Sequence, residues 1–542
     1  MQPVRCVRRS IASLRFLATI ALAALAGTQA ANAAVTISSE ATSNMNCSGG
    51  VCEPTAANAV LNAGDLETML ASGSVVVTTT GSGVQANDIV VAAPLSWSTS
   101  NVLTLEANRY LTIDAAVSVA GMGGLALADD GGVASLSFGS KGNVTFANLS
   151  GGLEINGSYY TLVDTISSLA SAIQSNPAGS YALAQSYDAK KDGTYKSPPV
   201  PTTFTGSFEG LGNTISNLRI SDASDSEVGF FEFINGGYVH DIGLEKAKIT
   251  SGASSVILGV LAGYVQGADM AGNSSSGVVT GSWTTGTLSD MASTYAQVGG
   301  LVGSACNFGS GYQMDAVIDS HSSVKISGGQ SNFAGGLVGY SCGGGSVENS
   351  YATGAITAGT CSYVGGLVGA STGYVEDSFA TGAATTGSSG DCGPPPSAGG
   401  LVGYNFGVGS SPGTITNSYS TGAAVGGSGT NVGGMVGLSY DGTVSDSYST
   451  GAPSAGSGSY VGGFVGDDDS ASLSDTYWDT TTSGITNASQ GAGNTSNAPG
   501  ISGLSTSQLQ AGLPPGFAKS VWKEKAKING GLPYLTANPP PK

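Results

Sequence analysis

The chain has 542 residues, of which 86 are glycine and only 10% are charged, with 18 basic against 36 acidic residues. Scarce helix formers and frequent Val, Thr, Tyr and Ser disfavour α-helical repeats and favour strands. Because an acidic surface repels phosphate backbones and anionic lipid, the composition also disfavours a nucleic-acid or membrane-surface role.

Residues 1–33 have the form of a cleavable signal peptide. Four arginines between Arg5 and Arg15 precede the apolar stretch Phe16–Ala26, and Ala31–Ala33 supplies a small-x-small cleavage site. No later stretch is long and apolar enough to span a bilayer. We therefore expect an exported chain without an integral membrane segment, located outside the cell or on its surface, with the periplasm as the alternative.

Removal of this segment leaves 14 basic and 36 acidic residues, and the remaining cations are unevenly distributed. Between Ile249 and Ala518 the only Lys or Arg is Lys325. The densest basic group, Lys519–Lys527, surrounds Trp522 near the C-terminus. We expect that group either to contact the acidic repeats, in the same or a neighbouring chain, or to be a solvated capping segment.

The N-terminal third predicts a short-stranded β structure. Residues 34–74 are expected to form a loosely ordered leader that ends in a helical stretch over Asn62–Ala71. Asp164–Ser175 is expected to form one helix, because Leu169 and Ile173 have helical spacing. Short apolar segments bounded by turn residues are predicted strands; these are Val75–Thr79, Asp88–Val91, Val102–Glu106, Tyr110–Ile113, Leu136–Phe138, Asn143–Phe146 and Leu153–Ile155.

A glycine-rich hexapeptide recurs six times in the second half of the chain. Successive copies start 36, 30, 34, 34 and 29 residues apart, a period typical of stacked arrays in which each unit buries its apolar face against its neighbours. The glycine pairs are expected at a corner that needs either positive φ or close backbone approach. The copies are Val298–Gly303, Ala334–Gly339, Val364–Gly369, Ala398–Gly403, Val432–Gly437 and Val461–Gly466.

A second element, Val347–Gly354, follows most hexapeptides and has echoes at 375–382, 415–422, 444–451 and 473–480. Strand alternation predicts that Val347, Asn349 and Tyr351 share one face. Stacked rungs would turn the aligned residues into ladders that stabilise the array. One predicted ladder is Asp319, Asn349, Asp377, Asn417, Asp446 and Asp475; the other is His321, Tyr351, Phe379, Tyr419, Tyr448 and Tyr477.

Six cysteines remain after removal of the signal peptide, an even number typical of an oxidising compartment. Cys306 and Cys342 occupy the same position relative to their hexapeptides, so stacking would place them about 4.8 Å apart on adjacent rungs. We therefore predict Cys306–Cys342 and Cys361–Cys392 as links between rungs. Cys47–Cys52 is predicted to close a small N-terminal loop. No Cys-x-x-Cys spacing indicates a metal site.

The sequence offers few candidates for catalysis. Its two histidines, His240 and His321, have no partner at metal-ligand spacing, and no convincing nucleophile elbow is present. Paired carboxylates are the better candidates, in Glu376–Asp377 and in Asp467, Asp468 and Asp469. We expect the first pair to belong to a ladder. The second group is expected in a turn, either solvated or holding calcium through hard oxygen ligands; no other cofactor is expected.

The hexapeptide followed by Asn349–Gly354 resembles the GLUG repeat of large bacterial surface proteins. Phe204–Leu218 is similar to the segment that opens such arrays, Tyr477–Gly484 to their closing motif, and Gly503–Leu535 to the cap that follows. Residues 88–200 resemble filamentous-haemagglutinin-like exoproteins. The resemblance implies a right-handed parallel β-helix that is secreted or surface-displayed and adhesin-like.

These observations predict an all-β solenoid with a short helical insert and a C-terminal cap. The expected segments are a signal peptide (1–33), a leader or N-terminal cap (34–74), haemagglutinin-like strands with a short helix (75–203), the GLUG-type array (204–485) and a C-terminal cap (486–542). We expect a non-enzymatic adhesin that binds carbohydrate or matrix polymers through a repetitive face, with self-association possible. The alternatives are a polysaccharide lyase or hydrolase that uses groove carboxylates, and a structural stalk.

Overall fold

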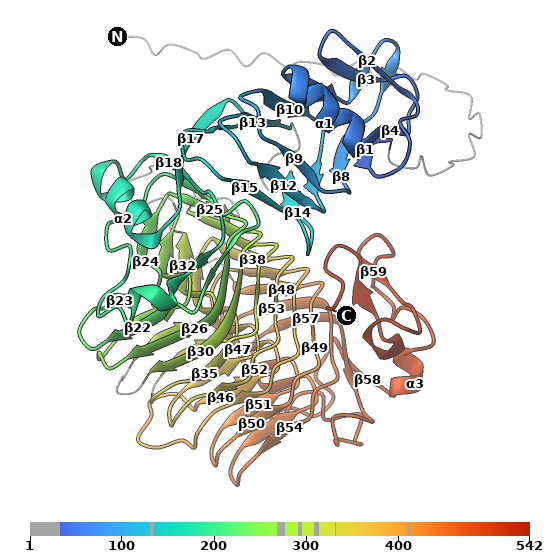
Figure 1. The fold of residues 1–542 in the computed structure, drawn as a ribbon. Helices are drawn as coiled ribbons and strands as arrows, with labels where there is room; N and C mark the ends of the chain where they lie inside the picture. The colour runs from blue at the N-terminus through green and yellow to red at the C-terminus, as the bar shows by residue number, and fades with distance from the viewer. Residues whose placement is uncertain are drawn as a thin grey trace, which may run out of the picture.

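The computed structural model describes residues 33–541 except 130–134, 268–276, 291–294, 308–313, 331 and 409–411. The expected signal peptide lies outside the described residues, apart from its last position. Within the described part of the chain, no helix is long and apolar enough to cross a membrane. Strands dominate the structure and stack in parallel (Figure 1), which confirms the predicted all-β solenoid.

The N-terminal coils build three parallel sheets around one apolar core. Their strands alternate between buried and outward-facing side chains, as in β10, where Leu103 and Leu105 point inward. The first sheet contains β1 (Ala34–Ser38), β4 (Ala59–Asn62), β8 (Asp88–Val91), β11 (Leu111–Ile113) and β14 (Leu136–Phe138). The second contains β9 (Leu95–Trp97), β12 (Ala116–Val119) and β15 (Asn143–Phe146). The third contains β3 (Val51–Pro54), β5 (Val75–Thr78), β10 (Val102–Glu106), β13 (Gly124–Ala128) and β16 (Gly152–Ile155).

The expectation of a loosely ordered leader is wrong. Residues 34–62 form β1, β4 and the hairpin of β2 (Met45–Ser48) and β3, because Val35, Ile37 and Leu61 complete the apolar core of the first coil. Helix α1 (Ala63–Ser72), capped by Asn62, then covers the end of that core with Leu66 and Leu70. A second small hairpin joins β6 (Thr80–Gly81) and β7 (Val84–Gln85).

An antiparallel turn joins the N-terminal coils to the repeat array. Strand β16 turns back into β17 (Ser158–Val163), which pairs in parallel with β18 (Ser180–Leu183), and β18 pairs with β20 (Ser207–Glu209). Helix α2 (Ile166–Ser175) lies between β17 and β18 and buries Leu169 and Ile173. At the junction the buried Asn213 amide donates to the carbonyl oxygens of Val144 (2.8 Å) and Leu183 (3.1 Å). The two parts of the solenoid therefore share hydrogen bonds as well as apolar contact.

The hexapeptide spans the corner between two eight-stranded parallel sheets in the described array. The strand before the corner ends at the first glycine, and the strand after it begins two residues beyond the second. The first sheet contains β23 (Glu227–Val228), β27 (Ile257–Gly259), β31 (Gln297–Gly299), β36 (Phe333–Gly335), β41 (Tyr363–Gly365), β46 (Ser397–Gly399), β51 (Asn431–Gly433) and β55 (Tyr460–Gly462). The second contains β24 (Phe231–Asn235), β28 (Ala262–Gln266), β32 (Val302–Asn307), β37 (Val338–Gly343), β42 (Val368–Ser371), β47 (Val402–Phe406), β52 (Val436–Tyr440) and β56 (Val465–Asp469).

Each rung then continues through up to three more short strands, which merge in some rungs into one long strand. The first column is β25 (Tyr238–His240), β29 (Val278–Thr280), β33 (Met314–Ile318), β38 (Gly345–Glu348), β43 (Tyr374–Glu376) and β48 (Thr414–Thr416). The second is β19 (Tyr187–Asp188), β21 (Thr214–Ser216), β34 (His321–Ser322), β39 (Tyr351–Ala352), β44 (Phe379–Ala380) and β49 (Tyr419–Ser420). The third is β22 (Arg219–Asp222), β35 (Lys325–Ser327), β40 (Ile356–Thr357), β45 (Ala384–Thr385), β50 (Ala424–Gly426) and β54 (Pro453–Ala455). The merged strands are β26 (Gly243–Ser251), β30 (Trp283–Asp290), β53 (Thr443–Ser449) and β57 (Ser472–Asp479).

The hexapeptide glycines are required by close packing and not by positive φ. Gly365 and Gly366 are absent from the positive-φ positions of the described chain. A Cβ on Gly366 would collide with the carbonyl of Gly400 and lie 2.9 Å from the Cβ of Ala380 on the opposite wall. In other rungs a serine takes the place of that alanine: Ser420 Oγ donates to the carbonyl of Gly434 at 2.6 Å. The walls of each coil touch at this point, so small residues are needed on both sides.

Candidate ligand-binding faces

The predicted aromatic ladder is present as a stack of rings on successive rungs. Tyr351, Phe379, Tyr419, Tyr448 and Tyr477 are paired in register from one strand to the next. Neighbouring ring centroids from Tyr351 to Tyr448 lie 4.8–5.3 Å apart, with interplanar angles of 5–8°. His321 stacks on Tyr351 at 4.6 Å and Trp283 stacks on His321 at 6.3 Å, so the ladder extends further than the repeated tyrosines.

The prediction that Val347, Asn349 and Tyr351 share one face is wrong. The reason also explains why Asp and Asn recur at the position of Asn349. Val347 is fully buried in the core, whereas Tyr351 belongs to a separate apolar cluster outside it. Asn349 between them has a φ of +49°, in the left-handed region that Asn and Asp adopt more readily than most residues. This turn shifts the strand phase by one residue. The matching positions share φ values of 47–49°: Asp319, Asn349, Asp377, Asn417, Asp446 and Asp475.

The C-terminal segment covers this ladder and lies beside the array (Figure 1). After β57, β58 (Ile501–Leu504) adds one more parallel pairing. The chain then runs back through α3 (Thr506–Leu509), β59 (Trp522–Lys523) and β60 (Tyr534–Leu535). Trp522 is fully buried, with its ring 5.9 Å from Tyr448 and 6.2 Å from Tyr419. From Phe379 to Tyr477 the ladder is therefore an internal interface and not a free binding surface, whereas Trp283, His321 and Tyr351 are half-buried.

All three cysteine pairs expected from sequence and repeat register are bonded in the structure. Cys306 and Cys342 face each other on paired strands β32 and β37, with their Cα atoms 4.5 Å apart. Cys361–Cys392 joins the loop before β41 to the loop before β46, which also contains Pro394–Pro396, and Cys47–Cys52 links β2 to β3. These bonds join neighbouring rungs or the two strands of a hairpin.

The acidic trio Asp467, Asp468 and Asp469 lies in strand β56, and not in the expected turn. Asp467 accepts from Asn431 at 3.0 Å and from Asn494 at 2.6 Å, whereas Asp468 accepts from the main-chain amide of Ala471. Successive side chains of a strand point to opposite faces, so the three carboxylates do not converge. Among the described residues, no group of three or more His, Cys, Asp or Glu is placed to hold a metal ion.

The four lysines of the C-terminal segment are all exposed on its outer side, while Trp522 faces the ladder. The single ion pair in the described part of the chain is Arg109–Asp88, so these lysines form no salt bridge with the array of their own chain. The apolar residues of the segment, and not its charge, hold it in place.

A second set of aromatic residues lies on the outside of the array and remains partly exposed. These rings lie on either side of the glycine corner, directly next to the hexapeptide or three residues beyond it. Tyr363 and Tyr404 stack at 5.1 Å, Tyr404 and Phe406 at 4.4 Å, and Phe333 and Tyr340 lie 5.3 Å apart. We call this the aromatic face; its members are Phe333, Tyr340, Tyr363, Tyr404, Phe406, Tyr440 and Tyr460.

The aromatic face is open to solvent along part of its length. Tyr440 is 44% exposed and Tyr460 is 50% exposed, and the other rings are half-buried. Burial raises the pKa of Tyr363 to about 12, so its hydroxyl stays protonated and able to donate hydrogen bonds at neutral pH. These residues are absent from the predicted ladders, although their recurrence near the hexapeptide is visible in the sequence.

A buried acidic pair near the start of the array was also missed. Glu209 is 3% exposed and Asp241 is 8% exposed, and they lie close to the junction with the N-terminal coils. Burial raises the pKa of Glu209 to about 7, and burial followed by repulsion from Glu209 raises the pKa of Asp241. His240, opposite Glu209 on the next strand, has its pKa lowered to about 4 by burial.

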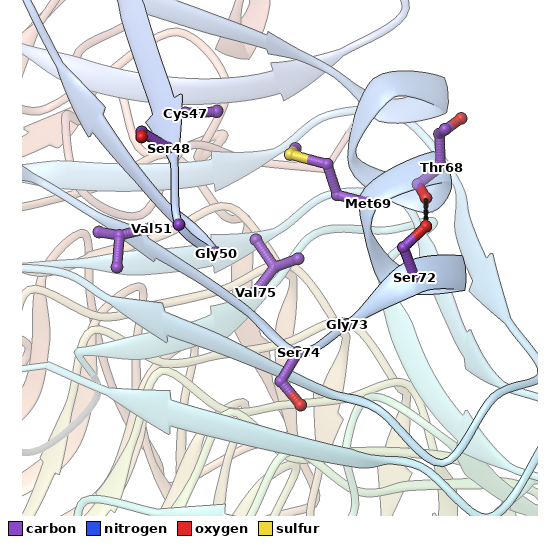
Figure 2. Close-up of a pocket in the computed structure, with 11 residues that line it drawn as sticks. Cys47, Ser48, Gly50, Val51, Thr68, Met69, Ser72, Gly73, Ser74 and Val75 are labelled. Carbon is purple, nitrogen blue, oxygen red and sulfur yellow. Dashed lines mark hydrogen bonds between the residues drawn. The ribbon is translucent and has the colours of Figure 1, made fainter.

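One concave pocket of about 440 Å³ lies between α1 and the β2–β3 hairpin (Figure 2). Met69 of the helix points toward the hairpin, where its sulfur lies 3.9 Å from that of Cys52. The rest of the lining consists of small, hydroxyl or apolar residues, and the only cysteine lining it is disulfide-bonded. The pocket therefore lacks an acid or base for catalysis.

The strand pairing, glycine corner and ladders define a repetitive β-solenoid. Residues 334–357, which contain one hexapeptide and the whole of the following element, match the GLUG motif family. Halomucin of Haloquadratum walsbyi is 33% identical over 205 residues, which cover 36% of this chain and 2% of halomucin. A proposed immunoglobulin A1 protease from Bacteroides ovatus aligns with a TM-score of 0.38 and 17% identity, covering 70% of this chain and 93% of that one.

Proposed function

We propose that the protein is an exported, surface-associated repeat protein that binds an extracellular carbohydrate or matrix polymer through the aromatic face, without catalysis. The contrast between its two aromatic stacks carries this proposal. One stack is covered by the C-terminal segment of the same chain, whereas the other stays partly exposed. Contiguous exposed apolar surface marks interaction sites on soluble proteins.

The geometry of the aromatic face suits a repetitive polymer. Its rings recur on rungs about 4.8 Å apart, so a linear ligand can make several weak contacts at once. The rings offer apolar surface to sugar rings, and the tyrosine hydroxyls offer polar partners to sugar hydroxyls. The GLUG motif at 334–357 and the match to halomucin support a repeat protein of the cell surface.

A glycan and matrix-protein array probed with the mature protein tests this proposal. We expect the double variant Tyr404→Ala/Tyr440→Ala to lose at least tenfold in affinity for the bound polymer. Tyr110→Ala/Tyr159→Ala is the matched control, because these two tyrosines are exposed on the N-terminal coils. Equal binding by both variants would reject the aromatic face as the site.

A polysaccharide-degrading enzyme is the second candidate, and Glu209 with Asp241 is the observation that favours it. Two carboxyl groups with raised pKa values are typical of acid catalysts. Their burial beside the junction requires an opening before a polymer could reach them. Reducing-end release from the same polysaccharides, abolished by Glu209→Gln and Asp241→Asn, would establish this function in place of simple binding.

A further inference from the structure

Three of the few cations of the chain line one surface pocket near the start of the array. The pocket has a volume of about 330 Å³. Its charged groups are Lys196, Arg219 and Lys248, and all three side chains are exposed. Hydroxyl groups complete its polar lining, from Thr194, Ser221 and Thr250. We call this the cationic pocket.

Strand pairing places these charges together. Arg219 of β22 lies opposite Lys248 of β26 in a parallel pair, and Ser221 lies opposite Thr250. Between them Ile220 and Ile249 point into the core, so the polar residues must point outward. The bridge between Tyr195 and Ile220 brings Lys196 to the neighbouring rung.

The pocket holds like charges side by side without neutralisation. Like charges on directly opposed strand positions destabilise a sheet. In the described part of the chain, Arg109 is the only cation within ion-pair distance of a carboxylate, so no carboxylate compensates the cationic pocket. Such an arrangement is favourable when an anion occupies the pocket. Arginine suits this role, because its planar guanidinium binds oxyanions through two hydrogen bonds.

The same outer face continues along the stack beyond the pocket. Lys248 is followed in register by Thr287 and then by Lys325, the only cation between Ile249 and Ala518. A parallel row of hydroxyl groups recurs beside it on six successive rungs: Ser221, Thr250, Ser289, Ser327, Thr357 and Thr385. Three of the four cations of the array, Arg219, Lys248 and Lys325, therefore lie on a face that otherwise carries hydroxyls.

We propose that the cationic pocket binds an anionic substituent, a sulfate ester or a carboxylate, of an extracellular polysaccharide. Arg219, Lys248 and Lys196 neutralise the anion, and the hydroxyl row bonds to the sugar hydroxyls of the adjoining units. This inference deepens the proposed function by naming an acidic polysaccharide as the ligand class. A DNA strand is disfavoured, because its backbone carries no free hydroxyl groups to pair with the hydroxyl row.

The experiment compares two double variants of the mature protein with equal loss of charge. Arg219→Gln/Lys248→Gln alters the pocket, whereas Lys523→Gln/Lys527→Gln removes two exposed lysines from the C-terminal segment. Binding to dextran sulfate, polygalacturonate and uncharged dextran is measured by calorimetry at low and moderate salt. The sulfated and carboxylated polymers distinguish the two anion types.

We expect the pocket variant to lose at least tenfold in affinity for one or both charged polymers, and the control variant to lose less than threefold. Binding should weaken with salt, and uncharged dextran should bind equally to all forms. Equal losses in the two variants would overturn the proposal, because attraction would then be non-specific. Binding of single-stranded DNA as tightly as of the polysaccharides would also overturn it.

A second measurement on the unmodified protein does not depend on folding of a variant. Amine-reactive labelling of Lys248 and Lys196, read by mass spectrometry, should fall several-fold when the charged polymer is bound. Labelling of Lys527 should stay unchanged. If Lys248 is labelled equally in the free protein and in a complex that has formed, the proposal that the cationic pocket binds the polymer is overturned. Retained binding of a neutral glycan at the aromatic face would show that the failure concerns the pocket alone.

Discussion

The hydroxyl of Tyr448, in the array, donates a hydrogen bond of 2.6 Å to the main-chain carbonyl of Pro533, 85 residues further along the chain. Asn529 donates to the same hydroxyl and to the same carbonyl, at 2.8 Å each. Further up the stack, Asn538 donates to the carbonyls of Ser350 and Asp377. These hydrogen bonds fix the C-terminal segment to three rungs, and the segment shields the ladder from Phe379 to Tyr477.

Replacing Trp522 with Ala should loosen this segment. Truncation of a buried Trp costs about 3–5 kcal/mol, and we expect a loss near the lower end because the segment can partly collapse. Hydrogen exchange should increase in the C-terminal segment and at the ladder strands, and binding of a hydrophobic dye should rise. The exposed Lys523→Ala is the control. Unchanged exchange in the Trp522 variant would show that the segment is held by other contacts.

Because Asn417 has a left-handed backbone conformation, a glycine at this position should give a more stable protein than an alanine. Asn417→Ala and Asn417→Gly both remove the amide, and they differ only in the Cβ atom. At a φ of +47° the alanine variant should be less stable by about 1 kcal/mol. Thermal unfolding of the two variants measures the difference. A glycine variant that is no more stable than the alanine variant would contradict the assigned turn.

Gly366→Ala should severely impair folding. Its Cβ would collide with the main chain of the next rung, and backbone cannot move aside without breaking the ladder of hydrogen bonds. We expect a large drop in soluble yield and in the melting temperature. Gly393→Ala is the matched control, since no atom lies within 4 Å of its added Cβ. A well-folded Gly366 variant would show that the walls can separate.

Glu209 should make stability depend on pH. Burial raises its pKa to about 7 from an ordinary 4.5, so the folded state binds the proton more tightly. Its contribution to stability therefore falls as pH rises from 4.5 to 7, by about 3 kcal/mol in total. Glu209→Gln should match the unmodified protein at pH 4.5 and melt at a higher temperature at pH 8. The exposed Glu106→Gln is the control for the loss of one carboxylate from the surface.

His321 should make stability depend on pH in the direction opposite to that of Glu209. Burial lowers its pKa to about 4 from 6.5, so the unfolded state binds the proton more tightly and stability falls as pH drops from 6.5 to 4. His321→Tyr restores the ladder residue and removes this titration. The stability gain of the variant should grow as pH falls through that range, as measured by denaturant unfolding at pH 7 and pH 4.5. If the stability gain of the variant does not depend on pH, the gain comes from ring packing and not from the removed titration.

The periodicity of the sequence made the array predictable. Particular residues show where prediction from periodicity succeeds and where it fails. Cys306 and Cys342 could be paired because both have the same offset from their hexapeptides, and stacking converts equal offset into contact. The phase of Tyr351 could not be predicted from strand alternation, because one left-handed residue at Asn349 reverses it. The four strands before α1 were missed, since their apolar residues complete a core that is built by later coils.

The sequence by itself determined the parallel solenoid, the Cys306–Cys342 pairing and the ring ladder, because each depends only on offsets within a repeat. Tertiary structure decided which aromatic stack is covered and which is open, because the covering segment returns from more than 80 residues away. It also decided where the rare cations gather, since Arg219 and Lys248 become neighbours only when their strands pair. Long-range contacts of this kind leave no local pattern in the chain.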